Sequence, residues 1–185
     1  MVPIAALWLP ILLAAVIVFV ASSVMHMVLP YHRSDCKQIP DEDKVLAAMR
    51  TAGVKRGLYM FPYSTHKDMK SPATMEKFKQ GPAGMLTVFP SGPPAMAKFL
   101  GMWFGYCLII GVFVAYLTGR TLHPGSSYLA VHRVAGCAAF MAYGLGNLAN
   151  GIWKGQPWRV VLKEVIDGLI YGSLTGGTFG WLWPR

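Results

Sequence analysis

The stretch IAALWLPILLAAVIVFVASSVMHMVL, residues 4–29, decides the fold of this chain. It contains no Asp, Glu, Lys or Arg, and it supplies the roughly 20 apolar residues that a helix needs to cross a bilayer. It is longer than the apolar core of a signal peptide, which has about 7–15 residues, and no Lys or Arg precedes it. We therefore expect a transmembrane helix that the protein retains.

Three later stretches predict helices of the same kind. Residues 95–119 hold an uncharged run, residues 127–150 begin after a Pro-Gly turn with Ser127 placed as a cap, and residues 159–183 follow a short loop. Short connections make these three helices antiparallel neighbours. Only 14% of the chain is charged, against roughly 25% in a typical soluble domain. The expected fold class is an all-α integral membrane protein with four transmembrane helices.

Residues 30–94 form a different kind of segment between the first two of these helices. Eight of the thirteen prolines lie in it, which argues against long helices. Capping and stop residues predict short helices at 41–52 and 71–80, and two short apolar runs predict strands at 58–61 and 85–89. We therefore expect a Pro-rich, mixed α/β extramembrane insertion.

The net charge of +9 is distributed unevenly along the chain. Lys and Arg concentrate in residues 30–98 and in the loop after residue 153, whereas the opposite side has Arg120 and Arg185, with Arg133 near the outer end of the third helix. The positive-inside rule then places residues 30–94 in the cytoplasm and both termini outside. The excess of Lys favours contact with anionic lipid headgroups or with an acidic partner surface. No recognition motif for nucleic acid is present.

Glycines recur every fourth residue in the last predicted helix, at Gly168, Gly172, Gly176 and Gly180. This spacing removes the side chains along one stripe, so another helix can approach closely. The stripe fits packing against a helix of the same chain, or docking of a partner subunit or a flat cofactor.

The same helix opens with Lys163, Glu164 and Asp167. Lys163 and Asp167 are one turn apart and can pair, which predicts a salt bridge at the helix end. Charged residues within membrane segments also suggest ion or proton paths, so Glu164 and Asp167 could instead line such a path.

His26 lies in the last turns of the first predicted helix. A buried imidazole can serve as an axial ligand for haem iron or for chlorophyll magnesium. His132 is near the opposite face, so no second histidine is expected at the same depth, and either a single-ligand site or a structural role remains. The sequence requires no cofactor, although lipid, haem or a chlorophyll-type pigment could be held together with a partner.

Four residues after the first predicted helix invite a metal-site hypothesis: His32, Asp35, Cys36 and His66. Their spacing matches neither paired CxxC nor HExxH ligands, and no catalytic motif is present. We therefore predict no metal site here and no enzyme.

Several stretches resemble a family of small bacterial inner-membrane proteins with four helices and no assigned activity. They are HMVLPYHRSD at residues 26–35, PDED at 40–43, DGLIYG at 167–172 and FGWLW at 179–183. The resemblance implies a multi-pass protein of the bacterial inner membrane and brings no site residues with it.

The function that these features favour is a non-catalytic accessory subunit or assembly factor of a larger bacterial membrane complex, respiratory or photosynthetic. One alternative is a small homo-oligomeric transporter or channel that uses Glu164 and Asp167. Another is a membrane enzyme or metal-binding protein that uses His32, Asp35 and His66.

Overall fold

The computed structural model describes residues 1–185, which divide into two compact units. The helical unit comprises residues 1–35, 95–151 and 156–185. The insertion unit comprises residues 36–94 together with 152–155. The two are described separately.

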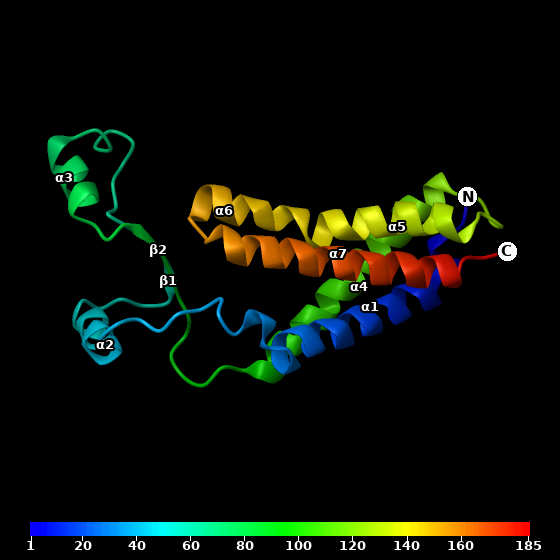
Figure 1. The fold of residues 1–185 in the computed structure, drawn as a ribbon, viewed down its shortest axis with the longest axis horizontal. Coiled ribbons are helices and arrows are strands. Elements are labelled where there is room, and N and C mark those ends of the chain that lie inside the picture. The colour runs from blue at the N-terminus through cyan, green and yellow to red at the C-terminus, as the bar shows by residue number, and fades with distance from the viewer. The chain divides into compact units, whose positions relative to one another are not determined.

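Four long helices build the helical unit (Figure 1). They are α1 (Trp8–Ser23), α4 (Met96–Thr121), α5 (Tyr128–Tyr143) and α7 (Trp158–Trp181). A 3-10 turn, Ile4–Leu7, precedes α1, and a π-helical turn, Val24–Val28, extends it. After α5 the chain passes through a 3-10 turn, Leu145–Asn147, into the short helix α6 (Leu148–Lys154).

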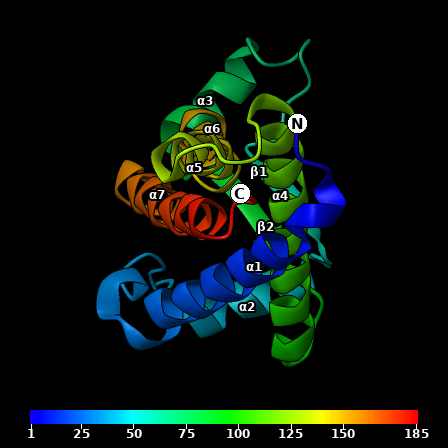
Figure 2. The same ribbon diagram turned by 90° about the vertical axis from the view of Figure 1, so that its right-hand side faces the viewer.

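The helices contact one another in a closed circuit of α5 with α7, α7 with α1, α1 with α4 and α4 with α5 (Figure 2). Val18, Val114 and Phe179 are among the fully buried side chains of the interior. Large apolar side chains also cover the outside of the helices; Met102 is 62% exposed and Phe113 is 65% exposed. Helices that are apolar on every side are typical of a membrane environment.

Three helical stretches are long and apolar enough to cross a membrane: Ile4–Val28, Met96–Thr121 and Tyr128–Lys154. The fourth predicted span is a helix too, but α7 is not among the three. Its first turns carry Arg159, Lys163, Glu164 and Asp167, and glycine replaces apolar side chains further along. The structure therefore confirms that all four predicted stretches are helical. It confirms the length and apolar character of a membrane span for three of them, and a membrane-spanning α7 stays a prediction.

The glycine stripe of α7 packs against α5 of the same chain. A Cβ added at Gly168 would lie 2.2 Å from the Cα of Gly144, and one added at Gly172 would lie 2.9 Å from the carbonyl oxygen of Gly136. Gly176 and Gly180 approach the first turns of α5 equally closely. The stripe thus serves a contact within the chain, which leaves no open glycine face on α7 for a partner subunit.

Both termini lie at one end of the helical unit (Figure 1). The backbone N–H of Val2 donates to the carbonyl oxygen of Gly119 at 2.8 Å, and the N–H of Gly125 donates to that of Pro184 at 2.8 Å. These two hydrogen bonds connect the N-terminus to the last turn of α4 and the C-terminal segment to the loop between α4 and α5. They therefore hold this end of the unit together.

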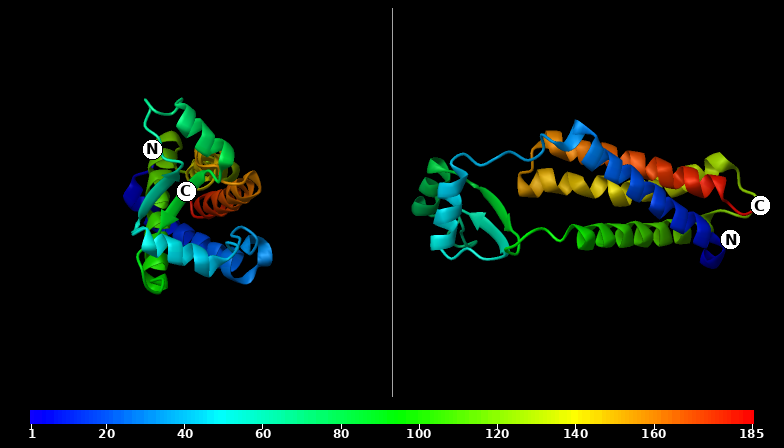
Figure 3. Two further views of the ribbon diagram at one scale, coloured as in Figure 1. Left: turned by 90° about the vertical axis from the view of Figure 1, so that its left-hand side faces the viewer. Right: turned by 90° about the horizontal axis from the view of Figure 1, so that it is seen from below.

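The insertion unit contains the predicted short elements: α2 (Glu42–Thr51), β1 (Gly57–Phe61), α3 (Pro72–Gln80) and β2 (Gly84–Val88) (Figure 3). The strands pair antiparallel with Gly57 opposite Val88 and Phe61 opposite Gly84. The Ser71 hydroxyl caps α3 by accepting from the N–H of Thr74. No side chain between residues 36 and 94 is buried, so this unit has no core of its own.

Candidate metal centre

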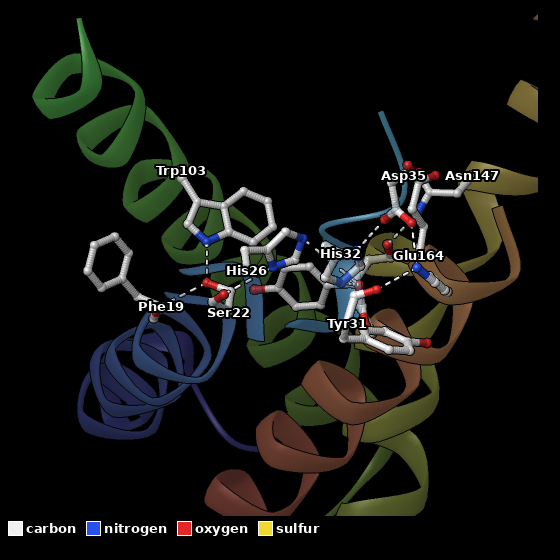
Figure 4. A network of polar contacts seen from close by, with 12 residues as sticks. Phe19, Ser22, His26, Tyr31, His32, Asp35, Trp103, Asn147 and Glu164 are labelled. Carbon is white, nitrogen blue, oxygen red and sulfur yellow. Dashed lines mark hydrogen bonds and ion pairs between the residues drawn. The ribbon is translucent and has the colours of Figure 1, made fainter. Parts of the chain in front are cut away.

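A reversal of the chain after α1 brings two histidines together. His26 lies in the π-helical turn, Leu29 is extended as a residue before proline must be, and Pro30 starts a 3-10 turn that ends at His32. The imidazole rings of His26 and His32 stack with their centroids 4.1 Å apart and their planes 8° apart (Figure 4). The second histidine at the depth of His26 therefore comes from the segment that directly follows the helix.

Asp167 of α7 points at both imidazoles. Its side chain is only 5% exposed, and its Oδ2 lies 2.9 Å from Nε2 of His32 and 4.0 Å from Nε2 of His26. The 2.9 Å contact is an ion-pair distance without hydrogen-bond geometry, and Nε2 of His32 has no hydrogen-bond partner. The second carboxylate oxygen, Oδ1 of Asp167, is also buried and unpaired. Such groups are rare in folded proteins, because each costs about 1–3 kcal/mol when left unsatisfied.

The other ring nitrogen of each histidine is held by an acceptor. Nδ1 of His26 lies 3.0 Å from the carbonyl oxygen of Ser22, and Nδ1 of His32 lies 2.6 Å from Oδ2 of Asp35. A carbonyl only accepts, and so does an ionised carboxylate, so both Nδ1 atoms carry the hydrogen and donate it. In the neutral rings both Nε2 atoms therefore present their lone pairs to Asp167. This tautomer and this kind of outer partner are the usual arrangement for histidines that bind a metal.

Lys163 holds Asp35, the outer partner of His32, in place. Its ammonium donates to Oδ1 of Asp35 at 2.5 Å and to the carbonyl oxygen of Tyr31 at 2.5 Å. Burial would raise the pKa of the Asp35 carboxyl, but the hydrogen bonds and charges of Lys163 and His32 outweigh it and hold that pKa below its ordinary value. The predicted Lys163–Asp167 salt bridge was wrong: Lys163 pairs with Asp35.

The three candidate ligand atoms lie close enough together to share one ion. Nε2 of His26, Nε2 of His32 and a carboxylate oxygen of Asp167 all lie within 4.8 Å of one another. Ligands about 2.0–2.1 Å from a tetrahedral metal are about 3.3 Å apart, which falls between the 2.9 and 4.0 Å contacts to Asp167. The planes of the stacked rings are only 8° apart and cannot share one in-plane ion, so one ring must tilt before both can bind it. The side chain of His26, 49% exposed, has the room to do so.

A cavity of about 450 Å³ adjoins two of the three residues. His26 and Asp167 form part of its wall, together with Glu164. One carboxylate oxygen of Glu164 accepts from the side-chain amide of Gln156 at 2.9 Å, and the other is buried without a partner. Four aromatic side chains from α4, α5 and α7 also line the cavity: Trp103, Tyr106, Tyr143 and Tyr171.

The structure brings together only some of the residues that the sequence singled out. His26, His32, Asp35 and Asp167 converge, whereas His66 and Cys36 belong to the insertion unit and take no part in the cluster. Sequence reasoning missed the pairing of His26 with His32. The signal available was the Leu29-Pro30 step, which ends the helix and turns the chain back.

No protein-family model, no curated protein and no solved structure matches this chain. The resemblance to small bacterial inner-membrane proteins therefore stays a prediction, and the site alone carries the argument about function.

Proposed function

We propose that this protein is a multi-pass protein of the bacterial inner membrane that binds one divalent transition-metal ion, of the Zn²⁺ class, through His26, His32 and Asp167. The observation that carries the proposal is the pair of buried atoms without hydrogen bonds, Nε2 of His32 and Oδ1 of Asp167, with Nε2 of a second imidazole, His26, 4.0 Å from the same carboxylate. Two imidazoles and one carboxylate suit Zn²⁺, and three protein ligands leave one position open.

The membrane part of the proposal rests on the apolar helices and on the distribution of charge. Three stretches are long and apolar enough to span, and α7 packs against α1 and α5, which belong to two of them. A helix held between two spanning helices crosses with them, and four spans place both termini on one side. The Lys-rich residues 30–94 then lie in the cytoplasm, where anionic headgroups attract them.

A plain ion-pair cluster is the main competing explanation of the site. If His32 were an imidazolium between Asp35 and Asp167, both of its nitrogens would donate to carboxylates. The Nδ1 atom does so, but the Nε2 hydrogen would miss Oδ2 of Asp167 despite the 2.9 Å separation. Metal titration separates the two explanations, because only the metal site predicts that one ion binds per chain.

Metal titration of the full-length protein in mild detergent tests the proposal. After treatment with a chelator, calorimetric titration with Zn²⁺ should show one ion per chain. Asp167→Asn and His32→Gln should each lower the affinity by at least about 100-fold, since loss of an outer partner alone costs 10–100-fold. His66→Gln, at an exposed histidine of the insertion unit, is the matched control and should leave the affinity unchanged. Equal affinity in all four proteins would refute the site.

Cation transport is a second candidate, favoured by one observation: Glu164 and Asp167 line the same cavity. It predicts Zn²⁺ flux into vesicles that contain the protein, and loss of that flux in Asp167→Asn. Vesicles with bound Zn²⁺ but no flux would leave binding as the function. The accessory-subunit prediction rested on smooth helix faces, the basic insertion and the lack of a catalytic motif, and it stays a prediction. The glycine stripe, one of those smooth faces, is occupied by α5.

A further inference from the structure

The cavity beside His26 and Asp167 has a group of ionisable side chains, here called its polar end, and an aromatic wall. Its polar end carries His26, Glu164 and Asp167, and Met27 and Leu100 add apolar surface elsewhere. The aromatic rings contact one another: the centroids of Trp103 and Tyr106 are 5.4 Å apart, and those of Tyr143 and Tyr171 are 5.6 Å apart at an interplanar angle of 79°. A wall of this kind offers edge and face contacts to a further aromatic ring.

Three buried polar atoms around this cavity have no partner in the protein. They are Oε2 of Glu164, Oδ1 of Asp167 and the hydroxyl of Tyr171. The three residues follow one another at positions i, i+3 and i+7, so they share one face of α7. Tyr171 itself is only 4% exposed. Two other polar groups of the wall are hydrogen-bonded within the protein: the indole N–H of Trp103 donates to Oγ of Ser22 at 2.8 Å, and the hydroxyl of Tyr106 donates to the carbonyl oxygen of Ala142.

The charges at the polar end define what fits there once the proposed ion is bound. A divalent ion with the carboxylates of Asp167 and Glu164 sums to zero, so a neutral head group is favoured over a charged one. Glu164 needs a hydrogen-bond donor, and the metal needs an oxygen lone pair. A hydroxyl group supplies both from a single oxygen atom.

We propose that this cavity binds a lipophilic phenol whose hydroxyl oxygen occupies the open position on the metal ion. The hydroxyl hydrogen is donated to Oε2 of Glu164, the Tyr171 hydroxyl donates to the phenol oxygen, and the phenol ring lies against Trp103. The inference rests on the proposed metal site. A cavity of about 450 Å³ falls within the range of small-molecule sites, about 300–1,000 Å³.

Cobalt provides a readout that separates this inference from the metal site itself. The full-length protein in detergent is loaded with Co²⁺, whose visible absorption bands report its ligands, and is titrated with 4-butylphenol. The expected result is a saturable change of the Co²⁺ bands at one phenol per chain. The matched ligand is 4-butylanisole, which has the same ring and tail without a hydroxyl group and should leave the bands unchanged.

Two tyrosine variants locate the effect within the cavity. Tyr171→Phe should weaken 4-butylphenol about tenfold, the size expected for one buried hydrogen bond, while Co²⁺ binding stays as in the parent protein. Tyr116→Phe is the matched control, because Tyr116 also belongs to α4 but does not line the cavity, and it should behave like the parent protein. Retained Co²⁺ bands show that each variant is folded at the site.

The outcomes are distinguishable. Absence of any Co²⁺ band overturns the metal site and this inference with it. Normal Co²⁺ bands that 4-butylphenol does not change, or that the anisole changes equally, overturn the phenol site alone and leave the metal proposal standing.

Discussion

Both the helical unit and the insertion unit contain large apolar side chains, but only the helical unit buries some of them. In the helical unit, Val18, Val114 and Phe179 are sealed from solvent, and glycines let α5 and α7 touch backbone to backbone. In the insertion unit, Leu58 is 65% exposed and Phe89 is 74% exposed, and no side chain between residues 36 and 94 is buried. Stability in a protein comes mainly from packed surface, so the helical unit is held by its packed interior and the insertion unit by the hydrogen bonds of its short helices and its strand pair.

A binding site needs side chains that are held in a fixed geometry, and the helical unit provides such a place. The candidate ligands lie where α1, α7 and the turn after α1 meet, and packing there holds the buried Asp167 and the partly buried His32 in place. The insertion unit is rich in titratable side chains for its length, yet its His, Cys, Asp and Glu side chains form no cluster of three. Fixed geometry, rather than the number of candidate residues, makes the cluster of His26, His32 and Asp167.

The largest expected difference between the units is in hydrogen exchange. Backbone amides of α5 and α7 should exchange at least about a thousandfold more slowly than those of β1 and α3, since only the first pair opens with the packed bundle. Exchange mass spectrometry of the protein in detergent or in nanodiscs measures this. Similar protection in both units would show that the insertion unit has a cover that the chain alone does not provide.

A single added methyl group in the α5–α7 contact should be the most destabilising small substitution. Gly168→Ala places a Cβ 2.2 Å from the Cα of Gly144, where no side chain can rotate away, so we expect a loss of about 3 kcal/mol or more. Gly105→Ala in α4 is the control, since a Cβ there meets nothing within 4 Å and should change stability by no more than about 1 kcal/mol. Thermal unfolding followed by circular dichroism compares them; equal stability would contradict the close contact.

Loss of an outer partner should weaken the proposed metal site without removing a ligand. Asp35→Asn abolishes the charge that receives the Nδ1 hydrogen of His32 and pairs with Lys163, so Zn²⁺ affinity should fall about 10–100-fold. Asp68→Asn is the matched control in the insertion unit, where the carboxylate contacts only the hydroxyl of Thr65. An unchanged affinity in Asp35→Asn would separate Asp35 from the metal site.

Substitution of two N-cap serines, one in each unit, has the smallest expected effect and compares the units directly. Ser71 caps α3 and Ser127 caps α5, and removal of such a cap costs about 1 kcal/mol. Ser127→Ala should lower the unfolding temperature of the helical unit, whereas Ser71→Ala should leave that temperature unchanged and only speed hydrogen exchange in α3. A common shift in both variants would show that the units unfold together.

The local elements could be predicted from the sequence because their signals are local. Gly53 and Gly81 stop α2 and α3, Ser71 caps α3, and apolar runs give the two strands to within about a residue. The long helices of the bundle could be predicted because most of them contain uncharged stretches long enough to cross a bilayer. The break at residues 144–147 between α5 and α6 was missed, since Gly144 and Gly146 within an apolar run do not by themselves reveal where a helix changes geometry.

The site could be predicted only in part, because it depends on contacts distant in sequence. His26 and Asp167 were singled out one at a time, from an imidazole in an apolar run and an acid within a helix. The two residues come close together because α1 packs on α7 and the chain turns at Pro30. The spacing of residues in the sequence does not reveal either feature. The pairing of Lys163 was wrong for the same reason: its partner, Asp35, comes from the distant turn and not from the same helix.

X-ray absorption at the zinc edge tests the central claim most directly. The full-length protein, loaded with one equivalent of Zn²⁺ in detergent, should show two imidazole nitrogens and a carboxylate oxygen at about 2.0–2.1 Å, and Asp167→Asn should lose this shell. A shell of oxygen atoms alone, or one that contains sulfur, would contradict the assignment of the ion to His26, His32 and Asp167.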